Sequence, residues 1–235
     1  MDRAAVAAIG FDIDHTLVID NKLERVALLR LLGRIEADGG RRSDNLDDEI
    51  AQIDALLQRQ RKGAFPIEDA VREFAIAHGA EPKDAYVEQF RSMAVAMVAD
   101  LAIPLPGVRE MLRALRERGI PVAVLSNGWN PLQIKKAQRA GFEGPVLASA
   151  DIGVQKPSAA AFAALLSALG TPAERTWFVG DDPNSDVDGS RLAGLGAVWF
   201  DWEGKTFPSE LAPPPHTIHA AMELLDLLPL GEEVR

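Results

Sequence analysis

A short apolar run close to the start of the chain, residues 6–11, ends in two aspartates that are separated by one residue. Neither face of the run carries a charge, and a run this short and apolar predicts a β-strand that is buried on both faces. Asp12 and Asp14 follow it directly, and residues two apart in a strand point to the same side. Two carboxylates that lie so close repel each other, so the sequence predicts a cation or a shared proton between them.

The second half of the chain alternates between predicted helices and short apolar strands. The strands are predicted at residues 120–125, 146–147, 177–180 and 197–200, and a last helix is predicted over about 218–228. Alternating strands and helices form a parallel sheet that has helices on both of its faces. The sequence therefore predicts an α/β fold with a doubly wound parallel sheet.

The stretch between the first and second strands has a different pattern. Apolar residues recur there at helical spacing, which predicts four helices and no convincing strand over residues 22–100. Pro104 and Pro106 then make a stiff, extended break, because a proline disfavours helix at the residue before it. We therefore expect an α/β core of residues 1–19 and 101–235, with an inserted all-helical cap of residues 20–100.

Composition excludes several kinds of partner. The formal net charge is -10 and no basic stripe is present, which argues against nucleic acid or an anionic membrane as the main partner. No apolar stretch is long enough to span a bilayer, and Asp12 interrupts the first apolar run too early for a secretory signal. The absence of cysteine excludes disulfides, a thiolate nucleophile and a zinc–thiolate site. We expect a cytoplasmic protein.

Polar side chains follow the predicted strands, at the edge where open parallel sheets bind their ligands. The candidate site residues are Asp12, Asp14, Ser126, Asn127, Lys156, Asp181 and Asp186. Together they supply carboxylates, hydroxyl and amide donors, and a cation placed just before a helix. Phosphoryl transfer needs such a set, because charge on the phosphoryl oxygens must be neutralised while an oxygen nucleophile attacks in line.

The order of these residues resembles the haloacid dehalogenase-like superfamily, in its phosphatase branch with a helical cap inserted after the first strand. The four motifs of that family match Asp12, Asp14 and Thr16, then Ser126, then Lys156, and finally Gly180, Asp181, Asp182 and Asp186. They occur in the family's order, so the resemblance covers essentially the whole chain. It implies a Rossmann-like sheet and hydrolysis of a phosphate monoester, with a small phosphorylated metabolite as substrate.

The resemblance also implies a role for each residue. Asp12 attacks phosphorus and forms an aspartyl-phosphate, and Asp14 protonates the leaving oxygen before it accepts a proton from water. Ser126 and the Asn127 amide hold a phosphoryl oxygen. Lys156 neutralises charge on the nucleophile and on the phosphate.

A magnesium ion is implied as cofactor. Its ligands are Asp12, the backbone carbonyl of Asp14, and Asp181, while Asp186 acts through a water or supports the other ligands from behind. Oxygen-only ligands suit Mg²⁺ or Mn²⁺ better than Zn²⁺. The adjacent Asp182 is interpreted as a residue that starts a helix.

Three alternative functions remain open. A phosphomutase shares the same motifs and differs only in where the phosphoryl group goes. A 2-haloacid dehalogenase has the same fold, but Asp14 argues against it, because displacement of halide needs neither an acid nor a metal. A catalytically silent binding protein could also keep the fold, and the intact set of acidic and basic residues argues against that function.

Overall fold

The computed structural model describes residues 6–61 and 63–228. The chain folds as two compact units, which divide between Ile19 and Asp20 and again between Ala102 and Ile103. One unit combines the first strand with the second half of the chain, and the other is helical. Among the helices of these residues, none is both long and apolar enough to cross a membrane.

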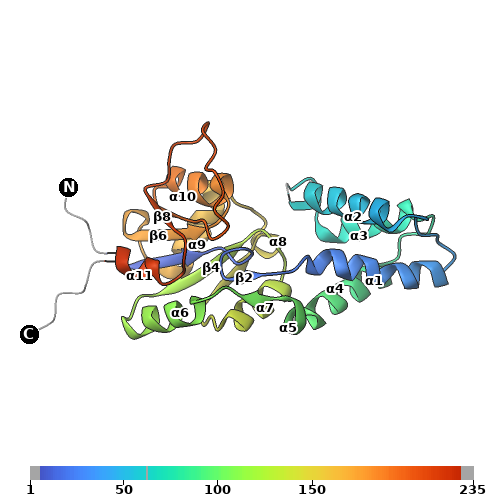
Figure 1. The fold of residues 1–235 in the computed structure, drawn as a ribbon, viewed down its shortest axis with the longest axis horizontal. Helices are drawn as coiled ribbons and strands as arrows, with labels where there is room; N and C mark the ends of the chain where they lie inside the picture. Colours follow the sequence, from blue (N-terminus) through green and yellow to red (C-terminus); the bar gives the residue numbers. More distant parts are fainter. Residues whose placement is uncertain (1–5, 62, 229–235) are drawn as a thin grey trace, which may run out of the picture. The chain divides into compact units, whose positions relative to one another are not determined.

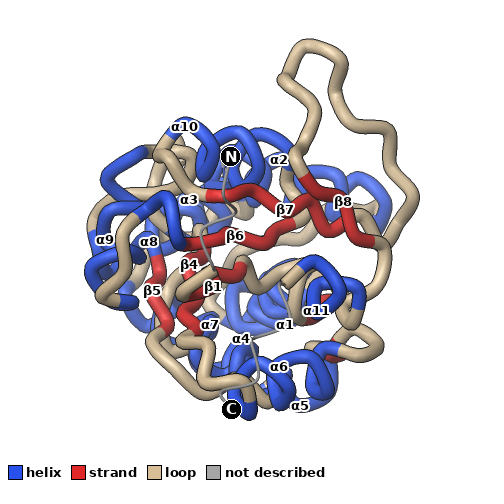
Figure 2. The backbone as a smooth tube through the Cα atoms, turned by 90° about the vertical axis from the view of Figure 1, so that its left-hand side faces the viewer, coloured by secondary structure: helices blue, strands red, loops and turns tan. Residues whose placement is uncertain are grey.

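The first unit is built on a parallel six-stranded sheet, in the order β5-β4-β1-β6-β7-β8 (Figure 2). The strands are β1 (Ala8–Phe11), β4 (Val122–Ser126), β5 (Val146–Ala148), β6 (Thr176–Gly180), β7 (Gly196–Phe200) and β8 (His216–Ile218). From β1 the chain first adds strands on one side and then on the other. This order confirms the predicted doubly wound α/β fold and places its switch point beside β1.

Helices cover both faces of this sheet. On one side lie α6 (Val108–Glu117) and α7 (Leu132–Ala140), and on the other α9 (Ala159–Leu169) and α10 (Gly189–Leu192); α8 (Ser149–Ile152) and α11 (Glu223–Leu227) are short (Figures 1 and 2). Phe162 and Leu165 of α9 pack in one apolar cluster with Phe178 of β6. A Cβ at Gly10 would lie 2.5 Å from Leu165 Cδ2, so a glycine in β1 allows α9 to pack this closely.

The pairing register brings the carboxyl ends of three strands together. Phe11 of β1 is the partner of Val124 in β4 and of Val179 in β6. The first aspartate of the chain's motif follows Phe11 directly, while Ser126 and Asp181 each lie two residues beyond their paired positions. Three of the predicted strand-end positions therefore share one edge of the sheet.

The helical unit consists of α1 (Leu23–Ala37), α2 (Leu46–Arg61), α3 (Ile67–Ala77), α4 (Asp84–Ala96) and the short α5 (Val98–Leu101). Helix α1 contacts α2 and α4, and α3 contacts the same two helices. Their buried faces carry apolar side chains that include Leu28, Leu31, Ile53, Phe74 and Phe90. This unit therefore has an apolar core of its own.

The segments that lead into and out of the helical unit pair with each other. Strand β2 (Val18–Ile19) lies antiparallel to β3 (Ile103–Pro104), a pairing that the sequence does not predict. A two-residue strand is too short to show an alternating pattern in the sequence. Pro104 fits this position, because an edge strand does not need every backbone N–H.

The end of the first unit also differs from the prediction of one helix over 218–228. Strand β8 occupies the start of that range, and α11 begins only at Glu223. The buried Ile218 extends the sheet at this edge, and its carbonyl accepts the N–H of Asp201 at 2.9 Å. The helical prediction was therefore wrong at its start, because a three-residue strand gives no clear periodicity.

Candidate active site

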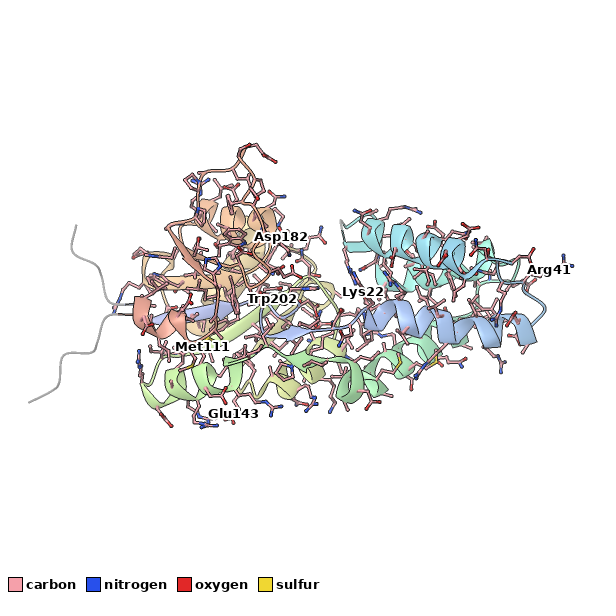
Figure 3. The ribbon with its side chains drawn as sticks, viewed as in Figure 1. Lys22, Arg41, Met111, Glu143, Asp182 and Trp202 are labelled. Carbon is pink, nitrogen blue, oxygen red and sulfur yellow. The ribbon has the colours of Figure 1, made fainter. Side chains whose placement is uncertain are left out.

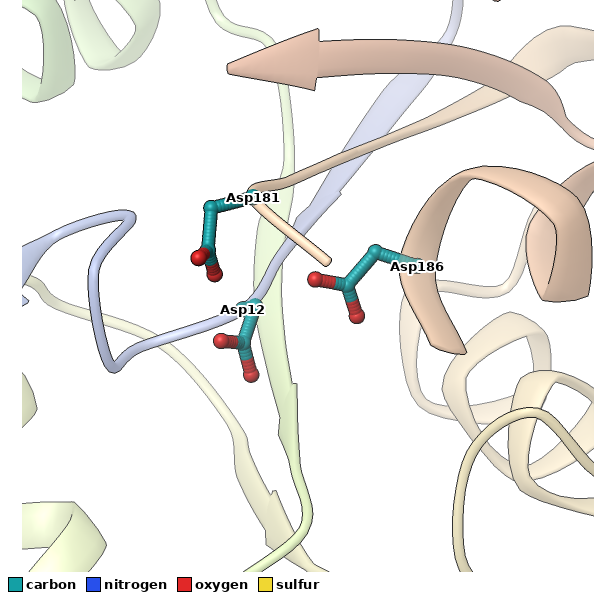
Figure 4. Close-up of side chains that lie close together, drawn as sticks. All are labelled: Asp12, Asp181 and Asp186. Atoms are coloured by element: carbon teal, nitrogen blue, oxygen red, sulfur yellow. The ribbon is translucent and has the colours of Figure 1, made fainter. Parts of the chain in front are cut away.

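Three carboxylates converge at the carboxyl ends of β1 and β6. Asp12 follows β1, Asp181 follows β6, and Asp186 lies in η2 (Pro183–Asp188), a short π-helical turn. One oxygen atom of each carboxylate lies within 4.8 Å of the others, as Figure 4 shows. Asp12 is 8% exposed and Asp186 is 1% exposed. The three acidic residues predicted at these strand ends thus form one largely buried cluster.

The backbone around Asp186 is shaped to receive its carboxylate. A Cβ at Gly180 would lie 2.2 Å from Asp186 Oδ2, so glycine is required there to leave room. The Asp182 N–H donates to the same oxygen at 3.0 Å. The Asp182 carboxylate instead accepts the N–H groups of Asn184 and Ser185, at 3.0 and 2.6 Å, and so caps the turn. This π-helical turn, whose i→i+5 hydrogen bonds make it wider than an α-helix, leads directly into α10.

Lys156 inserts its ammonium group among these carboxylates. Its Nζ donates to Asp12 Oδ1 at 2.7 Å and to Asp186 Oδ1 at 2.6 Å, and the residue is 3% exposed. Asn127 holds the backbone of Lys156 on both sides: its Oδ1 accepts the Lys156 N–H and its Nδ2 donates to the Lys156 carbonyl, both at 2.8 Å. The Asn127 side chain therefore supports Lys156, which leaves any phosphoryl contact of Asn127 to its backbone N–H. Ser126 ends β4 and is buried.

Burial and mutual repulsion raise the pKa values of these carboxyl groups. Burial, with the neighbouring charge of Asp12, raises the pKa of Asp181 to about 7. Burial also raises the pKa values of Asp12 and Asp186, although Lys156 opposes the increase. Burial alone would lower the pKa of Lys156, but the two adjacent carboxylates raise it above its usual range. Three carboxylates face the buried ammonium group of Lys156 and the half-exposed one of Lys205, which still leaves an excess of negative charge that a cation would relieve.

The cluster fits a magnesium ion in its donor atoms and its charge. Its possible ligands are carboxylate oxygens, and Mg²⁺ is held in proteins by a few carboxylates together with waters and substrate phosphate. Because Gly180 has no side chain, the Asp186 carboxylate has room to join this cluster. Asp12 and Asp181, with Asp186 beside them, are therefore the residues that would hold the ion.

The carboxylate of Asp14 lies apart from this cluster. Its Oδ1 accepts Lys136 Nζ at 2.7 Å and its Oδ2 accepts Gln133 Nε2 at 3.3 Å, while its side chain is 31% exposed. Both donors come from α7, and neither was singled out from the sequence. Gln133 and Lys136 are three residues apart, which places them on one face of the helix. The helix begins six residues after Ser126, and this closeness to a motif residue was the only hint in the sequence.

Strand β7 and the loop after it support the motif residues from the far end of the chain. Trp199 Nε1 donates to the Asp181 carbonyl at 3.0 Å. Trp202, labelled in Figure 3, donates its Nε1 to the His15 carbonyl at 2.8 Å and stacks on the His15 ring with centroids 6.2 Å apart. Lys205 Nζ lies 3.7 Å from Asp181 Oδ2. The contacts of Trp202 and Lys205 were not predicted, because both residues lie in a loop without periodicity. The strand predicted at residues 197–200 contains Trp199 but does not indicate its hydrogen bond to Asp181.

The raised pKa of Asp181 predicts how the metal-free protein responds to pH. Its folded-state value of about 7 exceeds the ordinary value, so the folded state keeps a proton that the unfolded state releases between about pH 4 and pH 7. This residue's contribution to stability is therefore present at low pH and lost as pH rises through 7. We expect Mg²⁺ to raise the melting temperature more at about pH 8 than at about pH 5.

Thermal melts with and without Mg²⁺ at the two pH values measure this effect. Asp181→Asn removes the titrating group. It should therefore reduce the difference between the Mg²⁺-induced shifts in melting temperature at pH 8 and at pH 5. An equal Mg²⁺-induced shift at both pH values would contradict the assignment.

Comparison with known proteins places this geometry in a family. A model of the haloacid dehalogenase-like hydrolases matches residues 6–194. The phosphoserine phosphatase of Thermus thermophilus is 36% identical over 135 residues, which are 55% of this chain and 54% of that protein. The chain thus spans about half the length of this curated relative. The glyceraldehyde 3-phosphate phosphatase of Methanopyrus kandleri is 26% identical over 82% of this chain and 83% of its own.

A solved structure shows the same fold over almost the whole chain. The 2-haloacid dehalogenase from Pseudomonas syringae pv. Tomato superposes with a TM-score of 0.73 at 22% identity, covering 94% of this chain and 97% of that one. The match of the family model extends from β1 to α10 and includes every motif residue described above. The chain therefore belongs to the haloacid dehalogenase-like hydrolase family.

Proposed function

We propose that this protein is a Mg²⁺-dependent phosphatase that cleaves a small phosphate monoester through an aspartyl-phosphate at Asp12. The observation that carries the proposal is the Asp12 carboxylate at the switch point of the sheet, 2.7 Å from Lys156 Nζ and clustered with Asp181 and Asp186. A phosphate bound there would meet a nucleophile and a fixed cation together. The two phosphatase relatives support this reaction class. The absence of cysteine keeps a reducing cytoplasm as our expected location.

In the first step a carboxylate oxygen of Asp12 forms a bond to phosphorus while the bond from phosphorus to the leaving oxygen breaks. Asp14 gives its proton to that oxygen. In the second step Asp14 takes a proton from water, whose oxygen attacks phosphorus and releases inorganic phosphate from Asp12.

The remaining residues neutralise charge during both steps. Lys156 and Ser126 would hold phosphoryl oxygens. Magnesium, bound by Asp12, Asp181 and the Asp14 carbonyl with Asp186 beside them, would supply the positive charge that offsets the phosphoryl oxygens.

Haloacid dehalogenation is the rival that the family name and the structural neighbour raise. Displacement of halide by a carboxylate requires no proton donor and no cation site. This chain has both a second motif carboxylate, Asp14, and a buried three-carboxylate cluster. These features favour phosphate ester hydrolysis. A phosphomutase would use the same residues, so a product assay must separate released phosphate from transferred phosphate.

We also propose that the helical unit, residues 20–100, acts as a lid and selects the substrate. The chain enters and leaves it through β2 and β3, two short segments that pair with each other. A compact unit on two short connections is suited to open and close. Residues 63–66, where the Arg59 guanidinium lies 4.8 Å from the Phe65 ring centroid, are our candidate for a loop that contacts substrate.

A substrate panel tests the proposed function. It should contain sugar phosphates, nucleoside monophosphates, phosphoglycolate, phosphoserine, a phosphoprotein and a 2-haloacid, each with Mg²⁺. We expect kcat/KM to be highest for a small phosphate monoester and poor for the phosphoprotein. Release of halide without hydrolysis of any phosphate ester would overturn the proposal, and efficient hydrolysis of the phosphoprotein would overturn the lid.

The role of Asp14 makes a separate prediction about leaving groups. An alkoxide is a poor leaving group and needs a proton, whereas an aryl oxide leaves readily. Asp14→Asn should therefore lower kcat/KM, which reports the steps up to departure of the leaving group, by at least about 100-fold for an alkyl phosphate and by much less for an aryl phosphate. Rates of the two substrates measured in parallel check this. Equal losses on both would refute the assignment of Asp14 as proton donor.

A further inference from the structure

Two donors on one face of α7 hold both carboxylate oxygens of Asp14. Gln133 and Lys136 are three residues apart, so their side chains project from the same side of the helix. Lys136 Nζ donates to Asp14 Oδ1 at 2.7 Å and Gln133 Nε2 donates to Asp14 Oδ2 at 3.3 Å. Lys136 is 1% exposed and Gln133 is 3% exposed. We call this pair of donors the α7 clamp.

The surrounding chain makes room for the α7 clamp. A Cβ at Gly128 would lie 2.1 Å from Gln133 Nε2, so this glycine, two residues after Ser126, is required for the amide to occupy its position. Gln133 Oε1 is buried and has no hydrogen-bond partner among the residues that the structure describes. A buried amide oxygen without a partner costs stability, and an apolar side chain of similar size would avoid that cost. The NH₂ group that bonds Asp14 gives a functional reason for the glutamine.

The position of Asp14 explains why a clamp would be useful. Its side chain is 31% exposed, so it has access to solvent and would sample several rotamers if nothing held it. A proton donor acts efficiently only when it is held within reach of the leaving oxygen. Two hydrogen bonds, one to each oxygen, fix both the place and the plane of the carboxylate.

We propose that Lys136 and Gln133 are positioning residues that orient Asp14 for proton transfer. This inference rests on the proposed phosphatase function and adds two residues to it. A positioning residue that acts through the proton donor should affect substrates in proportion to their need for a proton. A residue that serves only to pack α7 should affect all substrates alike.

The experiment compares an alkyl phosphate with an aryl phosphate in the full-length protein with Mg²⁺. Lys136→Met keeps the length of the side chain and removes its charge. We expect the ratio of alkyl to aryl kcat/KM, which reports departure of the leaving group and not the shared second step, to fall at least about tenfold, because a positioned acid contributes about 10² to 10⁴ in rate. Lys135→Met is the matched control: it makes the same change on the exposed side of α7 and should leave the ratio as in the unmodified protein.

A double-mutant cycle tests whether Lys136 acts through Asp14. Adding Lys136→Met to Asp14→Asn should cause no further fall in the ratio, since the group being positioned is already lost. Gln133→Leu removes one donor without removing a buried charge, and should lower the ratio in the same direction but less. If circular dichroism shows that Lys136→Met does not fold, the ratio measured for Gln133→Leu tests the α7 clamp instead.

Two results would overturn the α7 clamp. One is an unchanged or increased ratio in a folded Lys136→Met protein, or in Gln133→Leu where Lys136→Met does not fold. The other is an additional loss in the double variant. Failure of the proposed function looks different: the unmodified protein would then hydrolyse neither substrate, and the clamp would fall with it.

Discussion

Replacing Asp12 with asparagine is expected to abolish phosphatase turnover while leaving the fold intact. Asn has nearly the same shape as Asp but cannot act as the nucleophile. Loss of a covalent nucleophile should lower kcat by at least about a thousandfold. Initial rates with an aryl phosphate and Mg²⁺ measure the loss, and circular dichroism checks the fold.

The same substitution at an exposed site provides the control. Asp226→Asn lies on the outer side of α11 and should keep full activity. In Asp12→Asn, Lys156 loses one of its two carboxylate partners. The melting temperature of this variant should therefore be measured as well. A stably folded Asp12→Asn protein with more than about one-thousandth of normal kcat would show that another group is the nucleophile.

Removal of divalent metal is expected to have a comparably large effect. Asp12, Asp181 and Asp186 concentrate negative charge in a largely buried place, and a phosphate dianion would add more. A cation in such a site is worth several kcal/mol to the transition state, and about 1.4 kcal/mol is a factor of ten in rate. We therefore expect chelation to lower kcat at least about a hundredfold, with recovery on addition of Mg²⁺.

A titration with Mg²⁺ after chelation and dialysis measures this dependence. Mn²⁺ should also restore activity, since it accepts the same oxygen ligands. Asp181→Asn should weaken the apparent affinity for Mg²⁺. Undiminished activity in excess chelator would remove the metal from the proposed mechanism.

The sheet and the carboxylate cluster could be predicted from the sequence for a simple physical reason. Each buried strand is a short apolar run, and parallel strands that succeed one another through helices all end at the same edge. Asp12 and Asp181 directly follow such runs, so their meeting depends on topology alone. Asp186 depends in addition on the turn that Gly180 makes possible.

The contacts that support the cluster could not be predicted in the same way. Lys136 is charged and its spacing does not distinguish a solvent-facing position from burial against Asp14, which is 122 residues away. Trp202 bonds the His15 carbonyl across 187 residues, from a loop that has no periodic pattern. Such contacts depend on how α7 and the loop after β7 pack on the finished sheet. Local sequence therefore carries little information about them.

If the phosphoryl group passes through Asp12, an aspartyl-phosphate forms there, and direct detection of that intermediate is the test. The Asp14→Asn variant suits the measurement, because an aryl phosphate can still phosphorylate Asp12 while the base for the second step is missing. After an acid quench, peptide mass spectrometry should find one phosphoryl group on Asp12, labile to hydroxylamine as an acyl phosphate is. The contradicting result is an unmodified protein that releases phosphate while the quenched variant is phosphorylated at another residue or not at all. The phosphoryl group would then not pass through Asp12.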